Sequence, residues 1–453
     1  QIHGGVNEGT GFTYGFHGYW TKDWTCLDPN FGTMEDLAEF VSIAHQHGIR
    51  VLMDVIINHT GPVTEKDPLW PTEWVRTSPI CTYEGYHSTV YCTLTDNLPD
   101  IRTENNDKVD LPDVLVEKWK NEGRYDEEIK GLDAFFARTG YPRAPRYYII
   151  KWLVDYVKKF GIDGFRLDTA KHIEESVWAE LEKEVEMAFE VWKKANPDLV
   201  LDDNDFFMLG EVYNYGISGG RLYDFGNRLV DYFDYGIDGL INFDFKNDAR
   251  MPFETMFSKY DSILNSTLSR QVVVNYASSH DDGSPFDKER NRPLETGTRL
   301  LLCPGASQIY YGDETARSLI IEGTKGDATL RSFMNWEDIS NNNEISGIPV
   351  SDILNHWQKL GRFRRDHPAV GAGRHSMISR SPYVFSRTYT SDNLRDAIVA
   401  GLDLESGKKV LDVSSVFSNG TKLLDYYSGK VVAVKKGRVT VRSPFDMVLL
   451  GEF

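Results

Sequence analysis

Segments with strand and helix patterns alternate along most of this 453-residue chain. A capping-box sequence at residues 33–36 precedes a stripe of apolar residues at helical spacing (Leu37, Phe40, Val41 and Ala44), and the apolar run 51–57 follows it. Helices then alternate with five further strands, at 162–167, 206–210, 240–245, 272–276 and 308–311. Continuous apolar strands separated by helices predict a parallel α/β sheet or barrel, buried on both faces.

Two stretches interrupt this alternation. Residues 61–144 are too long for a structureless connection, so we expect them to form an inserted domain. From residue 373 onward the pattern changes to short strands, which predicts a closing antiparallel β domain. The expected organisation is therefore a catalytic domain of residues 1–60 and 145–372, the insertion 61–144, and a terminal domain 373–453.

Composition restricts the class of partner. Lys plus Arg number 50 and Asp plus Glu 68, which gives a net charge of −18. This balance argues against a nucleic-acid partner, which needs a basic face, and against an acidic polymer. The sequence has no apolar run of the roughly 18 residues that a membrane span requires. The 10 Trp and 23 Tyr permit a sugar ligand, although most such rings are expected in the core.

Polar residues gather where the predicted strands end. In a barrel, the carboxyl ends of the strands and the loops after them build the active site. A single acid in an apolar strand is as readily explained by a buried ion pair, but acids at successive strand ends favour a site. These strand-end residues are Asp54, Asn58, His59, Arg166, Asp168, Lys171, His172, Glu211, His280 and Asp281.

The reaction class follows from the acids. Glycoside hydrolysis uses two carboxyl groups on either side of the bond that breaks. Phosphoryl transfer would need a Gly-rich phosphate loop, and a two-metal site would need more His among the acids. Arg166 precedes Asp168 by two residues, so on a strand both point to one face. A guanidinium beside a carboxylate favours its charged form, which suits a nucleophile.

Four segments together resemble a known family. Residues 54–59, 164–172, 210–212 and 280–281 resemble, in order and spacing, the four sequence regions of the α-amylase family, glycoside hydrolase family 13. Residues 17–20 and 308–314 resemble two further family segments. The resemblance covers about residues 1–340. It implies a (β/α)8 TIM barrel with an inserted domain B and a C-terminal antiparallel β-sandwich, domain C.

The resemblance implies roles for three acids. Asp168 would be the nucleophile, Glu211 the general acid and base, and Asp281 the residue that stabilises the distorted sugar. The implied reaction is retaining hydrolysis of α-1,4 bonds in starch, glycogen or maltodextrins, with the carboxyl groups of Asp168 and Glu211 about 5–5.5 Å apart. A transglycosylase, a maltogenic or α-1,6-acting glucosidase and a non-catalytic glycan-binding relative are the alternatives.

Further residues match the family's sugar-binding positions. Asp327 and Arg331 match only by their spacing of four, which a solvated helical pair would share. The expected substrate-binding residues are His17, Tyr19, Trp20, His59, Arg166, Lys171, His172, His280, Asp327 and Arg331.

The resemblance also implies a calcium ion. Asn58, the carbonyl of His172 and a carboxylate of the insertion would supply oxygen ligands, as calcium requires. Asp100, in the sequence Leu-Pro-Asp at 98–100, is the candidate carboxylate. A second Leu-Pro-Asp at 111–113 leaves the register open. Bound Ca²⁺ would join the insertion to the barrel.

The four cysteines are too few for a disulfide scaffold. Paired cysteines in the insertions of some extracellular family members imply a disulfide between Cys81 and Cys92, and hence a periplasmic or secreted location. Cys303 is expected as a buried thiol, and Cys26 has no evident partner.

The chain departs from the family pattern in two places. Ser279 stands before His280, where Asn is usual. The family also has a strand, a helix and a second strand ahead of the segment that begins here. Because a barrel without two neighbouring strands exposes its edges, we expect those strands from an upstream segment or another chain.

Overall fold

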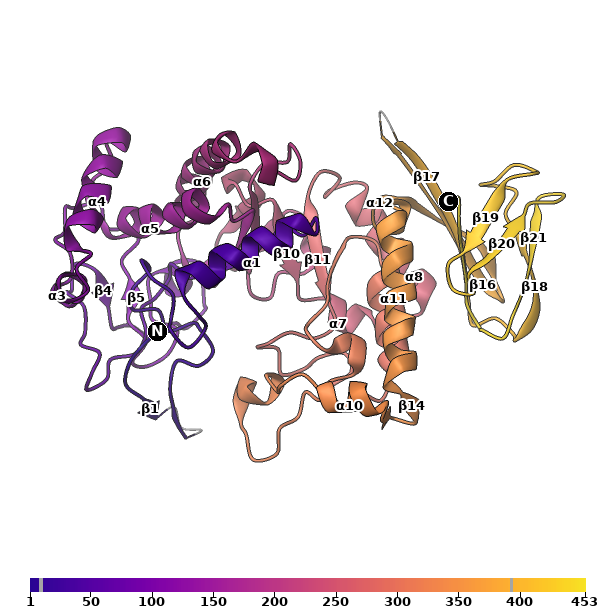
Figure 1. The fold of residues 1–453 in the computed structure, drawn as a ribbon, viewed down its shortest axis with the longest axis horizontal. Helices are drawn as coiled ribbons and strands as arrows, with labels where there is room; N and C mark the ends of the chain where they lie inside the picture. Colours follow the sequence, from indigo (N-terminus) through magenta and orange to yellow (C-terminus); the bar gives the residue numbers. More distant parts are fainter. Residues whose placement is uncertain (8–10, 392–393) are drawn as a thin grey trace. The chain divides into compact units, whose positions relative to one another are not determined.

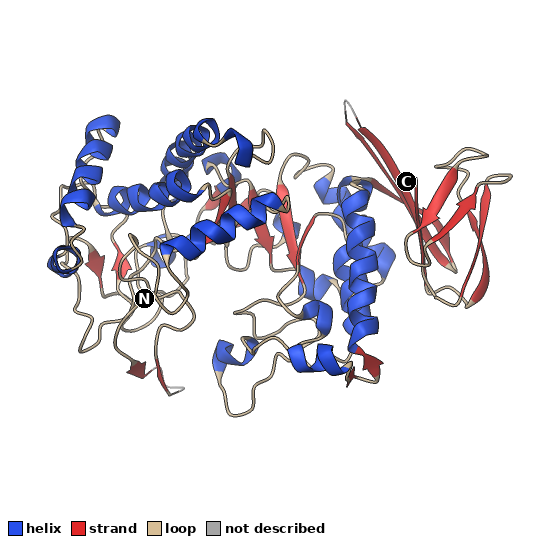
Figure 2. Ribbon diagram, in the orientation of Figure 1, coloured by secondary structure: helices blue, strands red, loops and turns tan. Residues whose placement is uncertain are grey.

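The computed structural model describes residues 1–7, 11–391 and 394–453. These residues divide into two compact units, one of Gln1–Tyr213 with Arg221–Ile241 and one of Asn214–Gly220 with Asn242–Phe453. Helices and strands alternate as far as residue 372, and strands dominate after it (Figure 2). The boundaries predicted at residues 60, 144 and 372 stay predictions.

The first unit is built on parallel strands with helices between them (Figure 1). The strands pair in the order β3, β6, β7, β10, so each lies beside the next parallel strand along the chain. Helix α5 packs against α1 and α6. The elements are β3 (Leu52–Val55), β6 (Gly164–Leu167), β7 (Phe207–Gly210), β10 (Gly239–Asn242), α1 (Met34–Gln46), α5 (Pro145–Phe160) and α6 (Glu175–Ala195).

Local signals explain where these helices begin and end. Thr33 and Asp36 form the predicted capping box at the start of α1. Each side chain accepts a hydrogen bond from the backbone N–H of the other residue. Helix α5 begins with Pro145 and ends before Gly161, which has φ 69°. The predicted capping box is confirmed.

The predicted core stripe of α1 is only partly correct. Val41 and Ala44 are buried, but Phe40 is 59% exposed. Leu52 of β3 is also exposed, at 38%. Within the described residues β3 pairs only with β6, so its other edge has no neighbouring strand. The prediction that the missing strands come from an upstream segment or another chain stays a prediction.

The predicted insertion contains short elements. Its strands β4 and β5 pair antiparallel, and Cys81 and Cys92 form the predicted disulfide, with an S–S distance of 2.07 Å. The elements of this segment are β4 (Val75–Arg76), α2 (His87–Val90), β5 (Asp100–Ile101), α3 (Asp113–Asn121) and α4 (Tyr125–Thr139). Two other antiparallel pairs of the unit are β1 (Val6–Asn7) with β2 (Phe12–Thr13) and β8 (Leu222–Asp224) with β9 (Leu229–Asp231).

Tryptophan rings join the insertion to α5. Nine of the ten Trp side chains are buried, which confirms that these rings are mainly core. Five of them pack together with ring centroids 5.1–6.3 Å apart: Trp24, Trp70, Trp74, Trp119 and Trp152. Edge-to-face and offset pairs at these distances stabilise a core beyond area burial alone.

The second unit holds a parallel pair, β11 (Val272–Tyr276) and β12 (Ala306–Gln308), with helices around it. The strand predicted at 308–311 is observed earlier in the chain, as β12 at Ala306–Gln308. Tyr310 and Tyr311 leave the strand because their hydroxyls donate to the carbonyls of Leu330 and Ser332. The helices are α7 (Phe245–Asp248), α8 (Phe253–Leu264), α9 (Pro293–Leu302), α10 (Trp336–Asn341), α11 (Val350–Asp366) and α12 (Ala369–Ala372), and a small hairpin is made by β13 (Glu344–Ile345) and β14 (Ile348–Pro349).

The last part of this unit is the predicted antiparallel β domain (Figure 1). A six-stranded sheet in the order β15-β16-β17-β22-β19-β20 and the pair β18-β21 bury one shared apolar core. β15 and β19 were not predicted from the sequence. The strands are β15 (Arg374–Arg380), β16 (Tyr383–Ser391), β17 (Leu394–Leu402), β18 (Gly407–Asp412), β19 (Lys422–Asp425), β20 (Lys430–Ala433), β21 (Arg438–Ser443) and β22 (Val448–Gly451).

Two arginines, the buried Arg387 of this domain and the half-buried Arg364 of α11, bind backbone carbonyls at the end of α9. Arg387 Nη1 of β16 donates to the carbonyl of Leu302 at 2.6 Å, and Arg364 Nη1 of α11 donates to that of Cys303 at 3.0 Å. Cys303 is fully buried, as predicted, and burial raises the pKa of its thiol to about 12. In the described part of the chain, no helix combines the length and apolar character that crossing a membrane requires.

His356 of α11 provides a pH-dependent link in this unit. Its Nε2 donates to the Leu294 carbonyl (2.9 Å), so Nδ1 accepts from the Tyr427 hydroxyl (2.7 Å). Burial lowers the pKa of His356 from 6.5 to about 4. The unfolded chain therefore binds a proton more readily than the folded one, and stability present above pH 6.5 is lost as the pH falls toward 4.

We expect His356→Gln to remove this dependence. The difference in unfolding free energy between wild type and variant should shrink by about 2 kcal/mol from pH 7 to pH 4.5, because only the wild type takes up the proton on unfolding. Urea unfolding at the two pH values measures it, with His47→Gln, an exposed histidine, as control. An unchanged difference at both pH values contradicts the prediction.

Candidate active site

The register of the parallel strands aligns the predicted catalytic residues. Asp54 of β3 is directly opposite Arg166 of β6, and Leu167 of β6 is opposite Gly210 of β7. Asp168 and Glu211 follow these two residues and therefore occupy one row at neighbouring strand ends. Neighbouring strands lie about 4.8 Å apart, so the register places the two carboxyl groups near each other.

One guanidinium contacts all three carboxylates. Arg166 Nη1 lies 2.6 Å from Asp168 Oδ1 and 3.0 Å from Asp54 Oδ1, and Nη2 lies 3.2 Å from Glu211 Oε2. Arg166, Asp168 and Glu211 have no more than 13% of their side chains exposed. The contact with Asp168 confirms the prediction that Arg166 and Asp168 share one face of β6.

Thr169 fixes the Glu211 carboxylate from a second side. Its backbone N–H donates to Glu211 Oε2 at 2.9 Å. Thr169 has φ 49°, in the left-handed region that residues other than Gly adopt rarely. Such a conformation persists only where the surrounding structure enforces it, and it is typical of functional sites.

Asp54 has a larger part in the site than the sequence revealed. Besides Arg166, it accepts a hydrogen bond from the Tyr19 hydroxyl at 2.6 Å. Although 39% of its side chain is exposed, crowding by protein atoms and the nearby Asp168 carboxylate raise the pKa of Asp54 to about 6, while Arg166 lowers it. The signal was present in the sequence, since Asp54 belongs to the same strand-end motif as His59.

His59 and its neighbour Asn58 are buried beside this group. His59 Nε2 donates to the Tyr19 carbonyl (3.1 Å), and Nδ1 accepts from Asn58 Nδ2 (3.2 Å). Burial lowers the pKa of His59, with Asp168 acting in the opposite direction. The structure thus brings His59 and Tyr19 together with the acids.

The aromatic segment 17–20 divides into two environments. His17 and Tyr19 are half-buried and their rings stack with centroids 5.9 Å apart. Trp20 is only 5% exposed and packs with Ile2 and Leu98 in a small apolar cluster. The predicted sugar contacts of these residues stay predictions.

Lys171 is surrounded by three tyrosines that the sequence did not predict as part of the site. Its Nζ donates to the Tyr213 carbonyl (3.1 Å) and the Tyr223 hydroxyl (3.2 Å), and it lies over the rings of Tyr83, Tyr213 and Tyr223 at 5.2–5.7 Å. Burial lowers the pKa of Lys171 to about 8, while Glu211 raises it. Tyr213 could have been noticed because it follows Glu211 by two residues.

His172 is buried against the insertion. Its Nδ1 donates to the Thr89 carbonyl at 2.9 Å, and burial lowers the pKa of His172 to about 4. Burial thus keeps the ring neutral near pH 7, while the contact with Thr89 joins the predicted insertion to the end of β6.

The remaining predicted residues belong to the second unit, where they cluster among themselves. Arg331 Nε donates to the His280 carbonyl at 3.0 Å. Burial and the neighbouring Asp281 raise the pKa of Asp327, while Arg331 lowers it. The unusual Ser279 donates its hydroxyl to Asp281 Oδ1 at 2.9 Å, so it holds that carboxylate.

The predicted calcium ligands have suitable chemistry. Asn58 and Asp100 are buried on neighbouring backbone segments, since the N–H of Ile101 donates to the Asn58 carbonyl at 2.8 Å. The Asn58 amide nitrogen contacts His59 Nδ1 at 3.2 Å. Asp100 Oδ2 accepts from Arg76 Nε at 2.7 Å.

Burial raises the pKa of Asp100 well above its usual range, against the effect of Arg76. A bound cation would favour the charged form. Among the residues that the structure describes, no group of three or more His, Cys, Asp or Glu side chains is arranged to hold a metal ion. The predicted set instead uses one carboxylate, one amide oxygen and the His172 carbonyl, a hard-oxygen set that fits Ca²⁺.

Comparison with known proteins identifies the family. The family model described as the α-amylase catalytic domain matches residues 12–353. The chain belongs to the α-amylase family. The segments 1–4, 192–197 and 278–281 had also suggested a likeness to bacterial periplasmic α-amylase. Periplasmic α-amylase of Escherichia coli is 33% identical over 455 residues that include 87% of this chain.

Other α-amylase family proteins are more distant. An α-amylase of Streptomyces lividans is 24% identical over 84% of this chain and 46% of its own length. A Bacillus cyclomaltodextrinase is 23% identical over 89% of this chain and 63% of its own length. This chain covers 61% of the length of the E. coli protein. It therefore spans about half to two thirds of these relatives.

Solved structures confirm the α-amylase fold. An α-amylase from Geobacillus thermoleovorans, complexed with acarbose, has a TM-score of 0.63 at 20% identity, over 96% of this chain and 84% of that one. An Anoxybacillus α-amylase has a TM-score of 0.62 at 21% identity, and the match covers 97% of this chain and 84% of that one. The predicted fold class, a TIM barrel with a C-terminal antiparallel β domain, is correct.

Proposed function

We propose that this protein hydrolyses α-1,4-glucosidic bonds in starch, glycogen or maltodextrins with retention of configuration. Membership of the α-amylase family supports the reaction class. The observation that carries the proposal is the single guanidinium of Arg166, which binds both Asp168 and Glu211. Retaining glycosidases need two carboxyl groups held close together, one to attack and one to transfer the proton.

In this proposal, contacts with Arg166 and Thr169 orient the two acids. Asp168 Oδ1 accepts from Arg166, so Oδ2 attacks the anomeric carbon and forms a covalent glycosyl ester. Glu211 Oε2 accepts from the Thr169 N–H and contacts Arg166, and these contacts hold the carboxyl group that carries the proton. Glu211 donates that proton to the glycosidic oxygen as the bond to the leaving sugar breaks.

In the second step Glu211 removes a proton from water. The resulting oxygen attacks the anomeric carbon, the ester bond to Asp168 breaks, and Asp168 is again a free carboxylate group beside Arg166. Asp54 and Tyr19 keep Arg166 in place through both steps by the contacts described above.

The other proposed contacts are with sugar hydroxyls and ring faces. Asp281 stabilises the distorted sugar through its hydroxyls. The remaining substrate-binding residues in this proposal are His17, Tyr19, Trp20, His59, Arg166, Lys171, His172, His280, Asp327 and Arg331.

We expect Asp168→Asn and Glu211→Gln to lower kcat on maltoheptaose by on the order of 10³-fold or more, because each removes a group that forms or breaks bonds. Reducing-sugar release with purified protein measures this effect. Asp155→Asn, a surface carboxylate of α5, is the matched control. Turnover of Asp168→Asn within tenfold of wild type would contradict the assignment and favour a non-catalytic relative.

Product analysis over time separates the alternative activities. Some relatives of this chain are a cyclomaltodextrinase and a glucanotransferase. Hydrolysis predicts products no longer than the substrate at all times. A transglycosylase would make longer glucans, a maltogenic enzyme would release only maltose, and an α-1,6-acting enzyme would cleave branched substrates first.

We also propose that Asn58, Asp100 and the His172 carbonyl bind Ca²⁺. The burial of Asn58 and Asp100 and the oxygen-only donor set support this site. Because these residues come from the end of β3, the insertion and the segment after β6, the ion would stabilise the fold around the acids and take no part in proton transfer.

Removal of calcium by EGTA should lower the melting temperature by roughly 5 °C, since an ion that binds only the folded state stabilises it. In Asp100→Asn the melting temperature should be the same with EGTA and with added Ca²⁺. Asp113→Asn, in the other Leu-Pro-Asp sequence, should keep the wild-type response. A wild-type protein unaffected by EGTA, with no calcium found by elemental analysis, refutes the site.

An oxidising location is the last part of the proposal. The Cys81–Cys92 disulfide supports a periplasmic or secreted protein. The E. coli relative is a periplasmic enzyme by name.

A further inference from the structure

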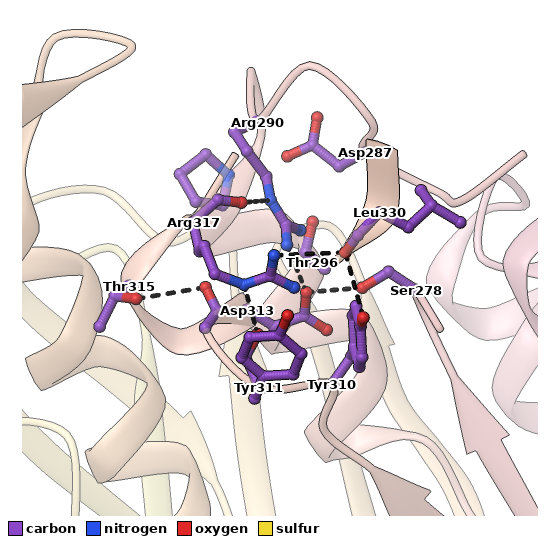
Figure 3. A network of polar contacts seen from close by, with 12 residues as sticks. Ser278, Asp287, Arg290, Thr296, Tyr310, Tyr311, Asp313, Thr315, Arg317 and Leu330 are labelled. Atoms are coloured by element: carbon purple, nitrogen blue, oxygen red, sulfur yellow. Dashed lines mark hydrogen bonds and ion pairs between the residues drawn. The ribbon is translucent and has the colours of Figure 1, made fainter. Parts of the chain in front are cut away.

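A buried polar network in the second unit connects three segments that are far apart in the sequence (Figure 3). Asp313, only 1% exposed, lies at its centre. Its Oδ1 accepts hydrogen bonds from Ser278 Oγ at 2.5 Å and from Arg290 Nη2 at 2.6 Å. Ser278 precedes His280 by two residues, so this contact holds the segment that carries Asp281.

Arg317 binds the backbone on both sides of Arg331. It is fully buried, and its Nη1 donates to the carbonyls of Leu330 (3.2 Å) and Ser332 (3.1 Å). Its Nε donates to the Tyr311 carbonyl at 2.8 Å, in the same turn as Asp313. The guanidinium carbon also lies 3.8 Å from the centre of the Tyr311 ring. Figure 3 shows the side chains of Arg317 and Tyr311 near each other.

Arg331 completes a closed ring of contacts. Its Nε donates to the His280 carbonyl, while Ser278 in the same segment is bound by Asp313. The segment 278–281 is therefore held at two points, and both lead back to the turn 311–317. One end of this ring depends on Arg317, because that side chain fixes the carbonyls on either side of Arg331.

Backbone conformation shows how closely Arg317 is fitted. Ala316 directly before it has φ 51° and ψ 38°, a left-handed conformation that costs energy in a residue with a Cβ. Gly312 has φ 82°, and a Cβ at that position would lie 2.5 Å from Arg317 Cβ. The turn thus requires glycine at 312 and directs Arg317 into the protein.

We propose that Arg317 is a positioning residue that acts through Arg331 and the His280 backbone on the Asp281 carboxylate. It does not touch the substrate. Loss of its two carbonyl contacts frees the segment around Arg331, and the His280 peptide and Asp281 shift with it. This inference rests on the proposed glucan hydrolysis for its effect on rate.

The direct test is Arg317→Lys, because an ammonium group cannot bind several carbonyls as a planar fork does. The variant should lower kcat on an aryl maltooligosaccharide by roughly 30-fold with KM changed less than about threefold, since a misplaced catalytic group affects mainly the transition state. Arg387→Lys is the matched control. Arg387 is equally buried and also binds backbone carbonyls, but it lies at the β domain.

A double-mutant cycle distinguishes positioning from general damage. If Arg317 acts through Asp281, Arg317→Lys should change kcat less than about twofold in an Asp281→Asn background. Gly312→Ala, which crowds Arg317 without removing it, should reproduce the kinetic effect. An equal loss of kcat in both backgrounds, or a fall in melting temperature with wild-type kcat, overturns the proposal.

Hydrogen exchange tests the same proposal without substrate. The amides of residues 278–282 should exchange faster in Arg317→Lys than in Arg387→Lys. If the wild type does not cleave α-glucans, the proposed function fails, and this exchange comparison alone decides the positioning role. Equal exchange in the two variants, with glucan cleavage intact, would sink the positioning role and leave the proposed function standing.

Discussion

The contact between Arg166 and three carboxylates is the interaction on which the site depends. A buried carboxylate without a partner is costly, and two of them close together repel. Arg166 compensates by placing its two terminal nitrogens against Asp54, Asp168 and Glu211. Removing a single partner from such a buried group leaves an uncompensated charge, so these four residues are expected to act as a unit.

This arrangement follows from strand register. A parallel sheet places residues of adjacent strands at the same height, and Asp54, Arg166 and the residues after them occupy such rows. A slip of one residue would turn every side chain to the opposite face. The apolar packing of α1, α5 and α6 and the tryptophan cluster is therefore what keeps the acids together, since it fixes the strands that carry them.

The sequence predicted what depends on local pattern. The capping box of α1 and the pairing of Arg166 with Asp168 follow from spacing alone, and the structure confirms them. The likeness of four short segments to one family supplied the fold class. The disulfide between Cys81 and Cys92 came from that likeness and is also confirmed.

Features that depend on long-range packing were not predictable. Phe40 fits a helical core stripe, but it is exposed because β3, which follows α1, is an edge strand in the described structure. The tyrosines around Lys171 come from segments more than 100 residues apart, and no spacing rule connects them. The hydrogen bonds of Arg317 likewise join residues that only the fold brings into contact.

The central claim is that Asp168 forms a covalent bond to the sugar while Glu211 handles the proton. The most direct measurement is mass spectrometry of the peptide that contains Asp168 after incubation with 5-fluoro-α-glucosyl fluoride, a substrate that forms the ester quickly and releases it slowly. The account predicts a fluoroglucosyl adduct on Asp168 that is absent from Asp168→Asn. An adduct on another residue, or none while glucan cleavage proceeds, would contradict it.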